Sequence, residues 1–293
     1  MSRIWSIPLF FFFSVLLLVV IGSGVAVNGF AGKIAASARS ADDTALNHPC
    51  YWNRLPFGVD DWITSAPTST ILADFSYETR TYEALVATQY GQGNVVYASG
   101  SVFSEIDNVA DPHNVKHEVF LNAIKWVTHD QVPMQTTVLV TYGHRELVTY
   151  AEWSHDCCGS NIVLALEEAG YTVEITSDIP ITLTGYGAVI MPGVGWYGTP
   201  QYPDPAYWSG DTGHAPTPVE VAALLNFVQN GGGLVASVEF NQGADWMNPI
   251  GRPMSVTFGS ISNNGAIRQA DRVAGHFVLA KHCISTYLPA VSR

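Results

Sequence analysis

The strongest constraint on the fold is a regular alternation of strand-like and helix-like segments after residue 136. Short aliphatic runs end in glycine or polar loops, and the segments between them repeat apolar residues at helical spacing. The expected strands span residues 137–142, 172–176, 188–191 and 234–240, and the expected helices span 161–169 and 219–229. Strands and helices that alternate in this way form a mainly parallel sheet with helices on both faces. The sequence therefore predicts an α/β domain over 136–258.

A shorter series of the same kind precedes this domain. Residues 79–130 are expected to form a partial α/β module. Its expected elements are a helix over 81–90, a strand over 94–99 and a helix over 117–127. The strands needed to complete such a module on its N-terminal side are missing from the pattern.

The segments outside these two regions are less regular. Residues 39–78 indicate a linker and an irregular segment with one short strand over 69–75. The tail, 259–293, is expected to be a helical extension, with its helix over 271–287.

The N-terminal 38 residues predict export from the cytoplasm. No charged residue lies between Arg3 and Lys33, and 4–27 is almost wholly apolar. A secretory signal has an apolar core of roughly 7–15 residues and a membrane-spanning helix needs about 20, so the length favours an uncleaved anchor. The small residues at 36–38 leave cleavage open as the alternative. In both cases the rest of the chain is extracytoplasmic, either secreted or membrane-anchored.

The four cysteines agree with an oxidising compartment. Cys50, Cys157, Cys158 and Cys283 allow three complete pairings, and the sequence does not choose among them. They show no Cys-x-x-Cys spacing of the kind that zinc ribbons use. His113 and His117 are four residues apart, but two imidazoles alone do not make a metal site. We therefore expect no metal centre and no cofactor.

The charge of the chain restricts its partners. There are 13 Lys and Arg against 25 Asp and Glu, which gives a net charge of -12. A protein that follows a phosphate backbone needs a concentrated basic surface. Nucleic acid is therefore excluded as a partner, and contact with a membrane is expected only through the apolar N-terminus.

Two loops carry the candidate ligand-binding residues. In a parallel sheet, ligands bind at the carboxyl ends of the strands, so the loops after the expected strands matter most. The loop 143–159 supplies His144, Arg145, His155 and Asp156. The segment 193–218 is unusually long and combines aromatic side chains with carboxylates, which suits stacking on sugars or capture of a peptide. Its candidates are Gly193, Trp196, Tyr197 and Trp208. Asn241, which follows the last expected strand, is a further ligand-binding candidate.

Two sequence runs carry a family resemblance. The run YGAVIMPG at 186–193 precedes the second helix of the domain, and GGGLVASVE at 231–239 follows it. This series resembles class I glutamine amidotransferase-like domains of flavodoxin type, particularly the ThuA-like and extracytoplasmic branches. The run YGQGNVVYASG at 90–100 looks like the closing half of another such domain. The tandem order is similar to the region before the peptidase-like domain of the TRP-channel-associated factors. The resemblance implies a flavodoxin-like sheet.

One departure from this family bears on activity. Amidotransferases of this fold place a cysteine on a tight turn after a strand, whereas Glu239 and Asn241 stand in the corresponding stretch. A carboxylate cannot replace the thiolate, so glutaminase activity is not expected. We expect a ligand-binding or interaction module for a glycan, a peptide or a protein. One alternative is a glycan or peptide hydrolase that uses Glu239 with His144 or His155, and another is a structural spacer for a partner protein.

Overall fold

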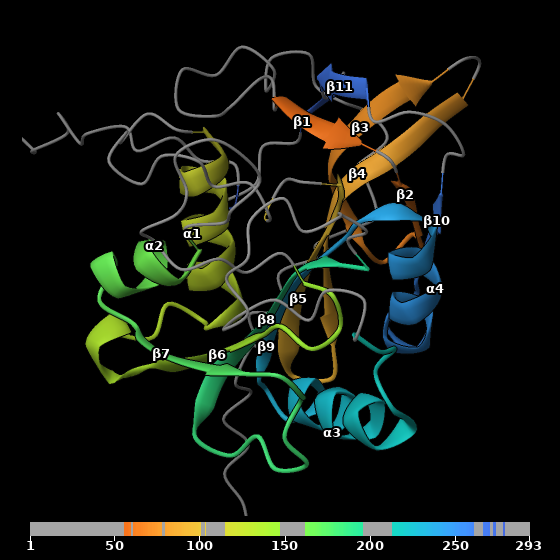
Figure 1. Cartoon of the computed structure of the whole chain (residues 1–293). Coiled ribbons are helices and arrows are strands. Elements are labelled where there is room, and N and C mark those ends of the chain that lie inside the picture. Colours follow the sequence, from red (N-terminus) through yellow and green to blue (C-terminus); the bar gives the residue numbers. More distant parts are fainter. Residues whose placement is uncertain are drawn as a thin grey trace, which may run out of the picture. The chain divides into compact units, whose positions relative to one another are not determined.

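The computed structural model describes a defined part of the chain (Figure 1). The described residues are 56–59, 61–77, 80–100, 103, 115–146, 162–195, 213–260, 266–269, 272–273 and 278. The predicted signal or anchor and all four cysteines lie outside them. Across the described ranges, no helix is long and apolar enough to cross a membrane.

The centre of the protein is one large mixed sheet. Its strand order is β10-β2-β4-β5-β9-β8-β6-β7, and β3 pairs with β4 and with β12. The strands of this sheet are β2 (Asp61–Ser65), β3 (Thr70–Tyr77), β4 (Arg80–Tyr90), β5 (Gly93–Ser99), β6 (Thr137–Thr141), β7 (Thr172–Thr176), β8 (Tyr186–Val194), β9 (Gly233–Val238), β10 (Val256–Ser260) and β12 (Arg272–Val273). Separately, β1 (Pro56–Val59) pairs antiparallel with β11 (Ala266–Gln269).

The prediction of a mainly parallel sheet is corrected by the strand directions. Pairs among β5, β9, β8, β6 and β7 are parallel. Pairs among β10, β2, β4, β3 and β12, and the pair of β4 with β5, are antiparallel. Because β5 pairs with β9, the predicted partial module and the predicted main domain share one sheet.

The segment 81–90 shows why the antiparallel half of the sheet was not predicted from the sequence. The sequence predicts a helix there, and the structure has strand β4 instead. Residues 84–88 of β4 are all buried, so the strand is covered on both faces. A continuous apolar run has no alternation, and its pattern cannot be distinguished from that of a buried helix. The turn at Gly91, whose φ is +61°, then returns the chain into β5 as a hairpin.

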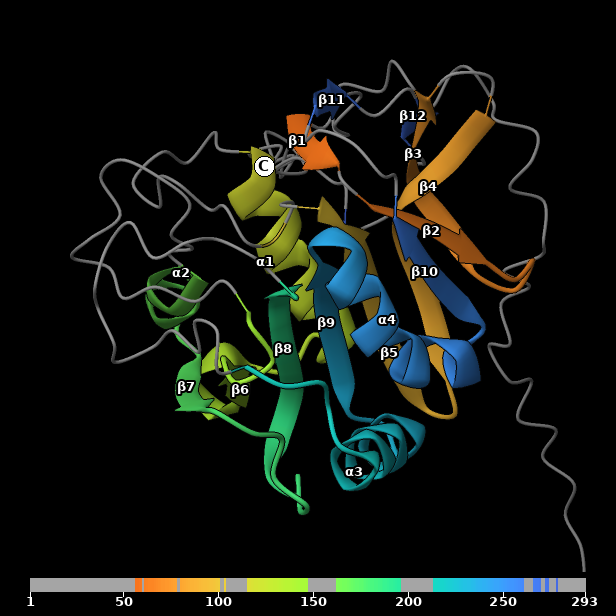
Figure 2. The same ribbon diagram turned by 45° about the vertical axis from the view of Figure 1, so that its right-hand side comes forward.

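Helices cover both faces of the sheet, as the sequence predicts (Figures 1 and 2). The helices are α1 (Val115–Val127), α2 (Ile162–Glu168), α3 (Pro218–Gln229) and α4 (Phe240–Gly251), with short 3-10 turns at Pro133–Gln135 and Arg252–Met254. Apolar side chains of α1 and α2 pack in one core layer, and those of α3 and α4 pack in the other. Strand β6 serves both layers, because Val138 and Val140 face the first and Leu139 faces the second.

The C-terminal part differs from its prediction. Helix α4 was not expected, since Gly243 and Pro249 inside it are poor helix formers. Where the sequence predicts a helical tail over 259–293, the described residues form the end of β10 and the strands β11 and β12. Pairing with β1 and β3, which are distant in the sequence, decides this outcome.

The topology of the parallel half defines where a ligand is expected to sit. The chain passes from β6 through α2 to β7 on one side, and then to β8 on the other side of β6. Such a reversal of direction opens a crevice at the carboxyl ends of the two central strands. In this sheet those are the ends of β6 and β8.

Candidate functional site

Backbone hydrogen bonds join the loops at the carboxyl ends of β6, β8 and β9. The amide of Gly195 donates to the carbonyl of His144 at 3.1 Å, and the amide of Glu239 donates to the carbonyl of Val194 at 2.8 Å. The residue pair 194–195 therefore connects His144 and Glu239, which the sequence placed at the same edge of the sheet. Both side chains are buried.

Two glycines bring helix α4 against the end of β8. A Cβ atom on Gly243 would lie within 3.0 Å of the carbonyl oxygen of Val194, and one on Gly195 would lie within 3.0 Å of the Gly243 amide. Gly195 also has φ of +84°. The predicted ligand residue Gly193 is buried, with φ of +65°, and its amide donates to Ser237 Oγ at 2.7 Å. These contacts hold α4 and the end of β9 close to the end of β8.

Glu146 folds the loop after β6 back onto its own strand. Its Oε1 accepts a hydrogen bond from the Thr141 hydroxyl at 2.5 Å, and its Oε2 accepts one from the backbone amide of His144 at 2.6 Å. Burial raises the pKa of the Glu146 carboxyl, while His144 and these hydrogen bonds lower it in part. Glu146 therefore holds the position of His144.

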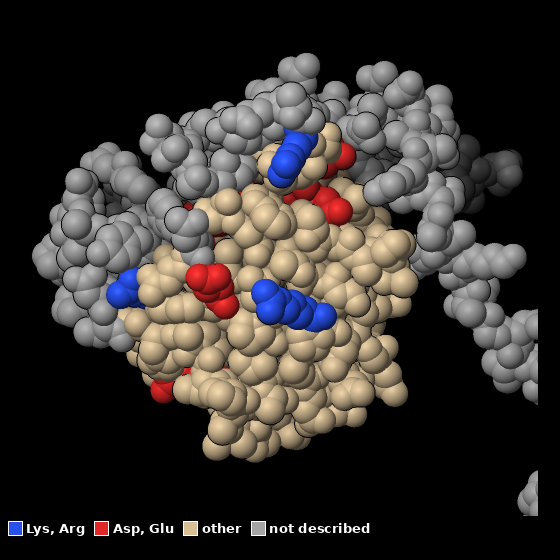
Figure 3. Space-filling model, turned by 90° about the vertical axis from the view of Figure 1, so that its right-hand side faces the viewer, with Lys and Arg blue, Asp and Glu red and all other residues tan. Residues whose placement is uncertain are grey.

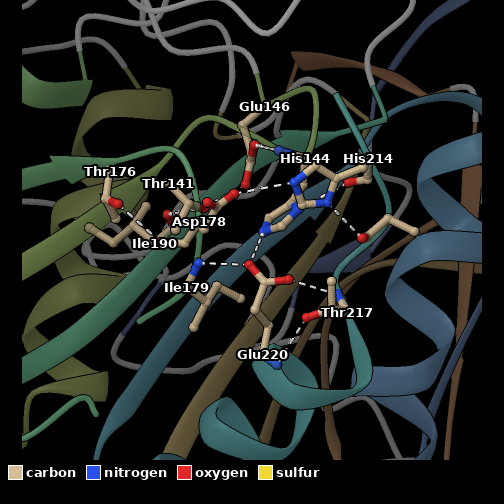
Figure 4. Close-up of polar contacts among 11 residues, drawn as sticks. Thr141, His144, Glu146, Thr176, Asp178, Ile179, Ile190, His214, Thr217 and Glu220 are labelled. Carbon is tan, nitrogen blue, oxygen red and sulfur yellow. Dashed lines mark hydrogen bonds and ion pairs between the residues drawn. The ribbon is translucent and has the colours of Figure 1, made fainter. Parts of the chain in front are cut away.

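His144 lies between two hydrogen-bond acceptors (Figure 4). Its ring is fully buried; Nδ1 lies 3.0 Å from the carbonyl oxygen of His214, and Nε2 lies 3.4 Å from Glu220 Oε1. A carbonyl oxygen only accepts, so Nδ1 carries a proton and donates it. Nε2 then faces the carboxylate. Both ring nitrogens are directed at protein groups.

Glu220 is an anion held at the start of α3. Its Oε1 accepts from the Ile179 amide at 2.9 Å and its Oε2 from the Thr217 amide at 2.7 Å, while Thr217 Oγ1 accepts from the Glu220 amide at 3.3 Å. This is a capping box. Burial alone raises the pKa of Glu220, but the hydrogen bonds from Thr217 and Ile179 and the nearby His144 bring it below the ordinary value.

His214 completes the cluster from the segment before α3. Its side chain is 49% exposed, and its ring meets the His144 ring edge-on with centroids 5.1 Å apart. Nδ1 lies 2.9 Å from the Ala215 carbonyl, and Nε2 lies 3.2 Å from Asp178 Oδ1. The Ala215 carbonyl contributes most to a raised pKa of His214, burial opposes it, and Asp178 and Glu220 add to it.

His144, His214 and Glu220 each offer one atom that can bind a metal ion, and these three atoms lie within 4.8 Å of one another. This spacing can hold a metal ion. The sequence predicted no metal centre, and no sequence motif indicated this group. His144 and His214 are 70 positions apart. The pattern Thr217-x-x-Glu220 was readable as a helix start, but nothing in it indicates that Glu220 faces His144.

Arg145 forms a second cluster with helix α4. Its backbone is left-handed, with φ of +58°. Its Nη1 donates to Gln242 Oε1 at 2.9 Å, and its Cζ lies 5.7 Å from the centroid of the Trp246 ring. All three side chains are partly exposed. An aromatic face, an amide and a guanidinium thus come together between the loop after β6 and helix α4.

Glu239 stands at the turn between β9 and α4. Its φ of -127° and ψ of 129° are ordinary extended values, and its side chain makes no capping hydrogen bond to the helix. The turn therefore lacks the backbone strain that exposes a nucleophile on a strand-to-helix elbow.

Six other candidate features lie wholly or partly beyond what the structure describes. His155, Asp156, Trp196, Tyr197 and Trp208 are outside the described residues. The backbone of Asn241 belongs to α4, and its side chain is outside the described set. On the face in Figure 3, the charged side chains of the described residues are few and scattered, without a basic stripe.

The chain shows only a distant structural likeness to known proteins in these comparisons. No family model matches the chain, and no curated protein matches it. The chain is similar to the IMPa metallopeptidase from Pseudomonas aeruginosa in complex with an O-glycopeptide, with 11% identity and a TM-score of 0.45 over 76% of this chain. A structure of that metallopeptidase with T-antigen gives 12% identity and a TM-score of 0.43 over 74%.

The chain spans 22% of the length of these metallopeptidase chains. Likeness at this level does not carry over an activity, a substrate or a metal centre. The similar structures are of the metallopeptidase, and the resemblance to glutamine amidotransferase-like domains stays a prediction.

Proposed function

We propose that this chain is an extracytoplasmic ligand-binding module that holds a carboxylate-bearing glycan or peptide beside the carboxyl ends of β6 and β8. The observation that carries the proposal is the cluster of Arg145, Gln242 and Trp246. An Arg guanidinium pairs with a carboxylate through two parallel hydrogen bonds, and an aromatic face stacks on a sugar ring or an apolar side chain.

The backbone of Arg145 supports this assignment. A left-handed conformation costs a residue other than glycine roughly 1–2 kcal/mol, and such strain gathers at functional sites. The loop after β6 holds Arg145 in this conformation and presents its side chain to α4. The net charge of -12 disfavours a polyanion at long range, so a ligand with a single carboxylate fits better.

The test uses Arg145→Gly. Glycine accepts the left-handed backbone, so the variant should unfold with the same free energy or with up to about 1 kcal/mol more, while binding is lost. Calorimetric titration with a sialylated oligosaccharide, its neutral parent, a peptide with a free C-terminus and the amidated peptide separates the ligand classes. We expect binding of one carboxylate form at least tenfold tighter than of its neutral partner, and loss of that preference in Arg145→Gly.

Ser255→Gly is the matched control. Ser255 is also left-handed, with φ of +64°, and it lies in the turn before β10. This variant should keep full binding. Equal binding of all four probes, or unchanged binding in Arg145→Gly, would contradict the proposal. Absence of binding by the folded wild-type chain would favour the structural spacer.

A hydrolase is the second candidate, supported by the backbone link between Glu239 and His144 through 194–195. A general base needs an atom directed at the substrate, and both ring nitrogens of His144 face protein acceptors. Glu239 and His155 are therefore the residues to test. Glu239→Gln keeps the shape of the side chain and removes its charge. It should abolish turnover of a glycan or peptide substrate in a hydrolase and leave binding intact in a binding module.

A further inference from the structure

We infer that His144, His214 and Glu220 form a binding site for a divalent transition metal ion of the zinc class. The site is separate from the Arg145 cluster, and the inference does not depend on the proposed function. It rests on the hydrogen-bond roles of three side chains that come from the β6 loop, the segment before α3 and the first turn of α3.

His144 has the arrangement of a metal-ligating histidine. Such residues usually donate one ring N–H to a carbonyl or carboxylate, which directs the other nitrogen at the ion. Nδ1 of His144 donates to the His214 carbonyl at 3.0 Å. Nε2 is buried and makes no hydrogen bond within the described residues. In a neutral ring its lone pair points toward Glu220 Oε1, 3.4 Å away, and two facing acceptors repel. A cation between them removes this repulsion.

Glu220 is preorganised as an anionic ligand. Two backbone amides hold its carboxylate at the N-terminus of α3. These hydrogen bonds fix the carboxylate without a metal, so binding an ion requires little further ordering. Ile179 and Thr217 supply the outer hydrogen bonds that orient a ligating carboxylate.

The spacing suits a small tetrahedral ion. Zinc bonds of 2.0–2.1 Å place neighbouring ligand atoms about 3.4 Å apart. The separation of His144 Nε2 and Glu220 Oε1 already has this value. The ligand nitrogen of His214 lies within 4.8 Å of both of these atoms. Its half-exposed ring can turn toward the ion and give up its contact with Asp178.

The ligand chemistry selects the class of ion. Two imidazoles and one carboxylate are a zinc ligand set that leaves a fourth position for water, whereas calcium and magnesium prefer oxygen ligands throughout. The rival explanation is a protonated His144 that donates to both acceptors, with no metal bound.

The test is metal titration of the full-length chain without a polyhistidine tag, after removal of metal with a chelator. Zinc binding is followed by calorimetry and cobalt binding by its visible absorption bands. We expect one equivalent bound, an intense tetrahedral cobalt spectrum, and a rise in Tm with zinc by mass action. His214→Ala should weaken zinc at least tenfold and abolish the cobalt spectrum, because it removes one of three ligands without emptying a buried position.

Two further variants keep the result interpretable. Glu220→Gln can keep the capping-box hydrogen bond from Thr217 but loses the one from Ile179, and it removes the ligand charge. It should fold with reduced stability and bind zinc more weakly. His129→Ala changes an exposed histidine outside the cluster and should bind as the wild type does. Unchanged zinc binding in His214→Ala places the ion elsewhere in the chain and overturns the inference. Absence of zinc binding by the folded wild type also overturns it and leaves a proton between His144 and Glu220.

Discussion

The two halves of the central sheet differ in where equivalent strand ends lie. In the parallel half, β5, β9, β8, β6 and β7 run in one direction and all carboxyl ends share one edge. In the antiparallel half, β10, β2, β4 and β3 alternate in direction, so equivalent ends are divided between two edges. The buried polar residues His144, Ser237 and Glu239 follow or end parallel strands and therefore lie at the same edge of the sheet. Strand direction, more than residue type, places them there.

The antiparallel half is packed around aromatic side chains. Phe75 stacks on Tyr82 with centroids 5.6 Å apart, and Phe258 of β10 meets Tyr97 of β5, the strand that borders the parallel half, edge-on at 5.1 Å. Such pairs add about 0.5–1.5 kcal/mol each beyond the area that they bury. We interpret this half as a contributor mainly to stability.

Helix α4 belongs to both halves. Its N-terminal part contacts the end of β8 through Gly243. Farther along, Asn248 Nδ2 donates to the Phe258 carbonyl at 3.0 Å, and the Phe258 amide donates to Asn248 Oδ1 at 2.9 Å. Substitutions at Gly243 and at Phe258, the partner of Asn248, therefore perturb opposite ends of α4. They test whether binding depends mainly on the parallel half and stability mainly on the antiparallel half.

The largest effect on stability is expected from Phe258→Ala. Phe258 is 2% exposed, and truncation of such a ring typically costs about 3–5 kcal/mol of unfolding free energy. Denaturant unfolding measures this loss. Val219→Ala, at a side chain that is 55% exposed, should stay within about 0.5 kcal/mol of the wild type. Where the Phe258 variant is folded, ligand binding should be unchanged; a loss of binding at equal folded fraction would show that the halves are coupled.

Gly243→Ala should reduce stability less than Phe258→Ala does, and it should reduce ligand affinity more. Its Cβ would lie within 3.0 Å of the Val194 carbonyl, so α4 must move away from the end of β8. Overpacking of this kind costs about 1–3 kcal/mol. Because Gln242 and Trp246 move with α4, affinity for the carboxylate ligand should fall at least tenfold in calorimetric titration. Asp245→Ala, an exposed neighbour in α4, is the control, and equal affinities in the two variants would contradict the prediction.

The smallest effect is a pH dependence away from the crevice. Burial lowers the pKa of His117 in α1, although Glu168 and Glu118 partly oppose it. The folded state therefore favours the neutral ring, and its contribution to stability is present above the ordinary His pKa of about 6.5 and lost as pH falls toward the lower folded value. His117→Gln should lose less stability than the wild type between pH 7.5 and 5.5 in denaturant unfolding. An equal loss in both proteins would remove His117 as the cause.

The parallel half could be predicted from sequence more fully than the antiparallel half. Strands β6 to β9 and helices α1, α2 and α3 lie at or near their predicted positions, because each carries its own apolar pattern and end signals. Strand β4 could not be recognised, since its buried run Ala84–Thr88 has no alternation. Helix α4 has weak intrinsic propensity and forms through packing against β8 and β10.

The residues of the candidate site could also be predicted only in part. Arg145, His144 and Glu239 were predicted because they directly follow apolar strands. The partners Gln242, Trp246, His214 and Glu220 were not, because no pattern in the chain indicates which distant residue they face.

The sequence by itself determined the alternation of strands and helices in the parallel half and the placement of polar residues after strand ends, because local spacing and end signals encode both. The tertiary structure alone decided the mixed sheet, helix α4 and the contact of His144 with Glu220. Those features depend on hydrogen bonds and packing between segments far apart in the chain, and local patterns carry no record of such contacts.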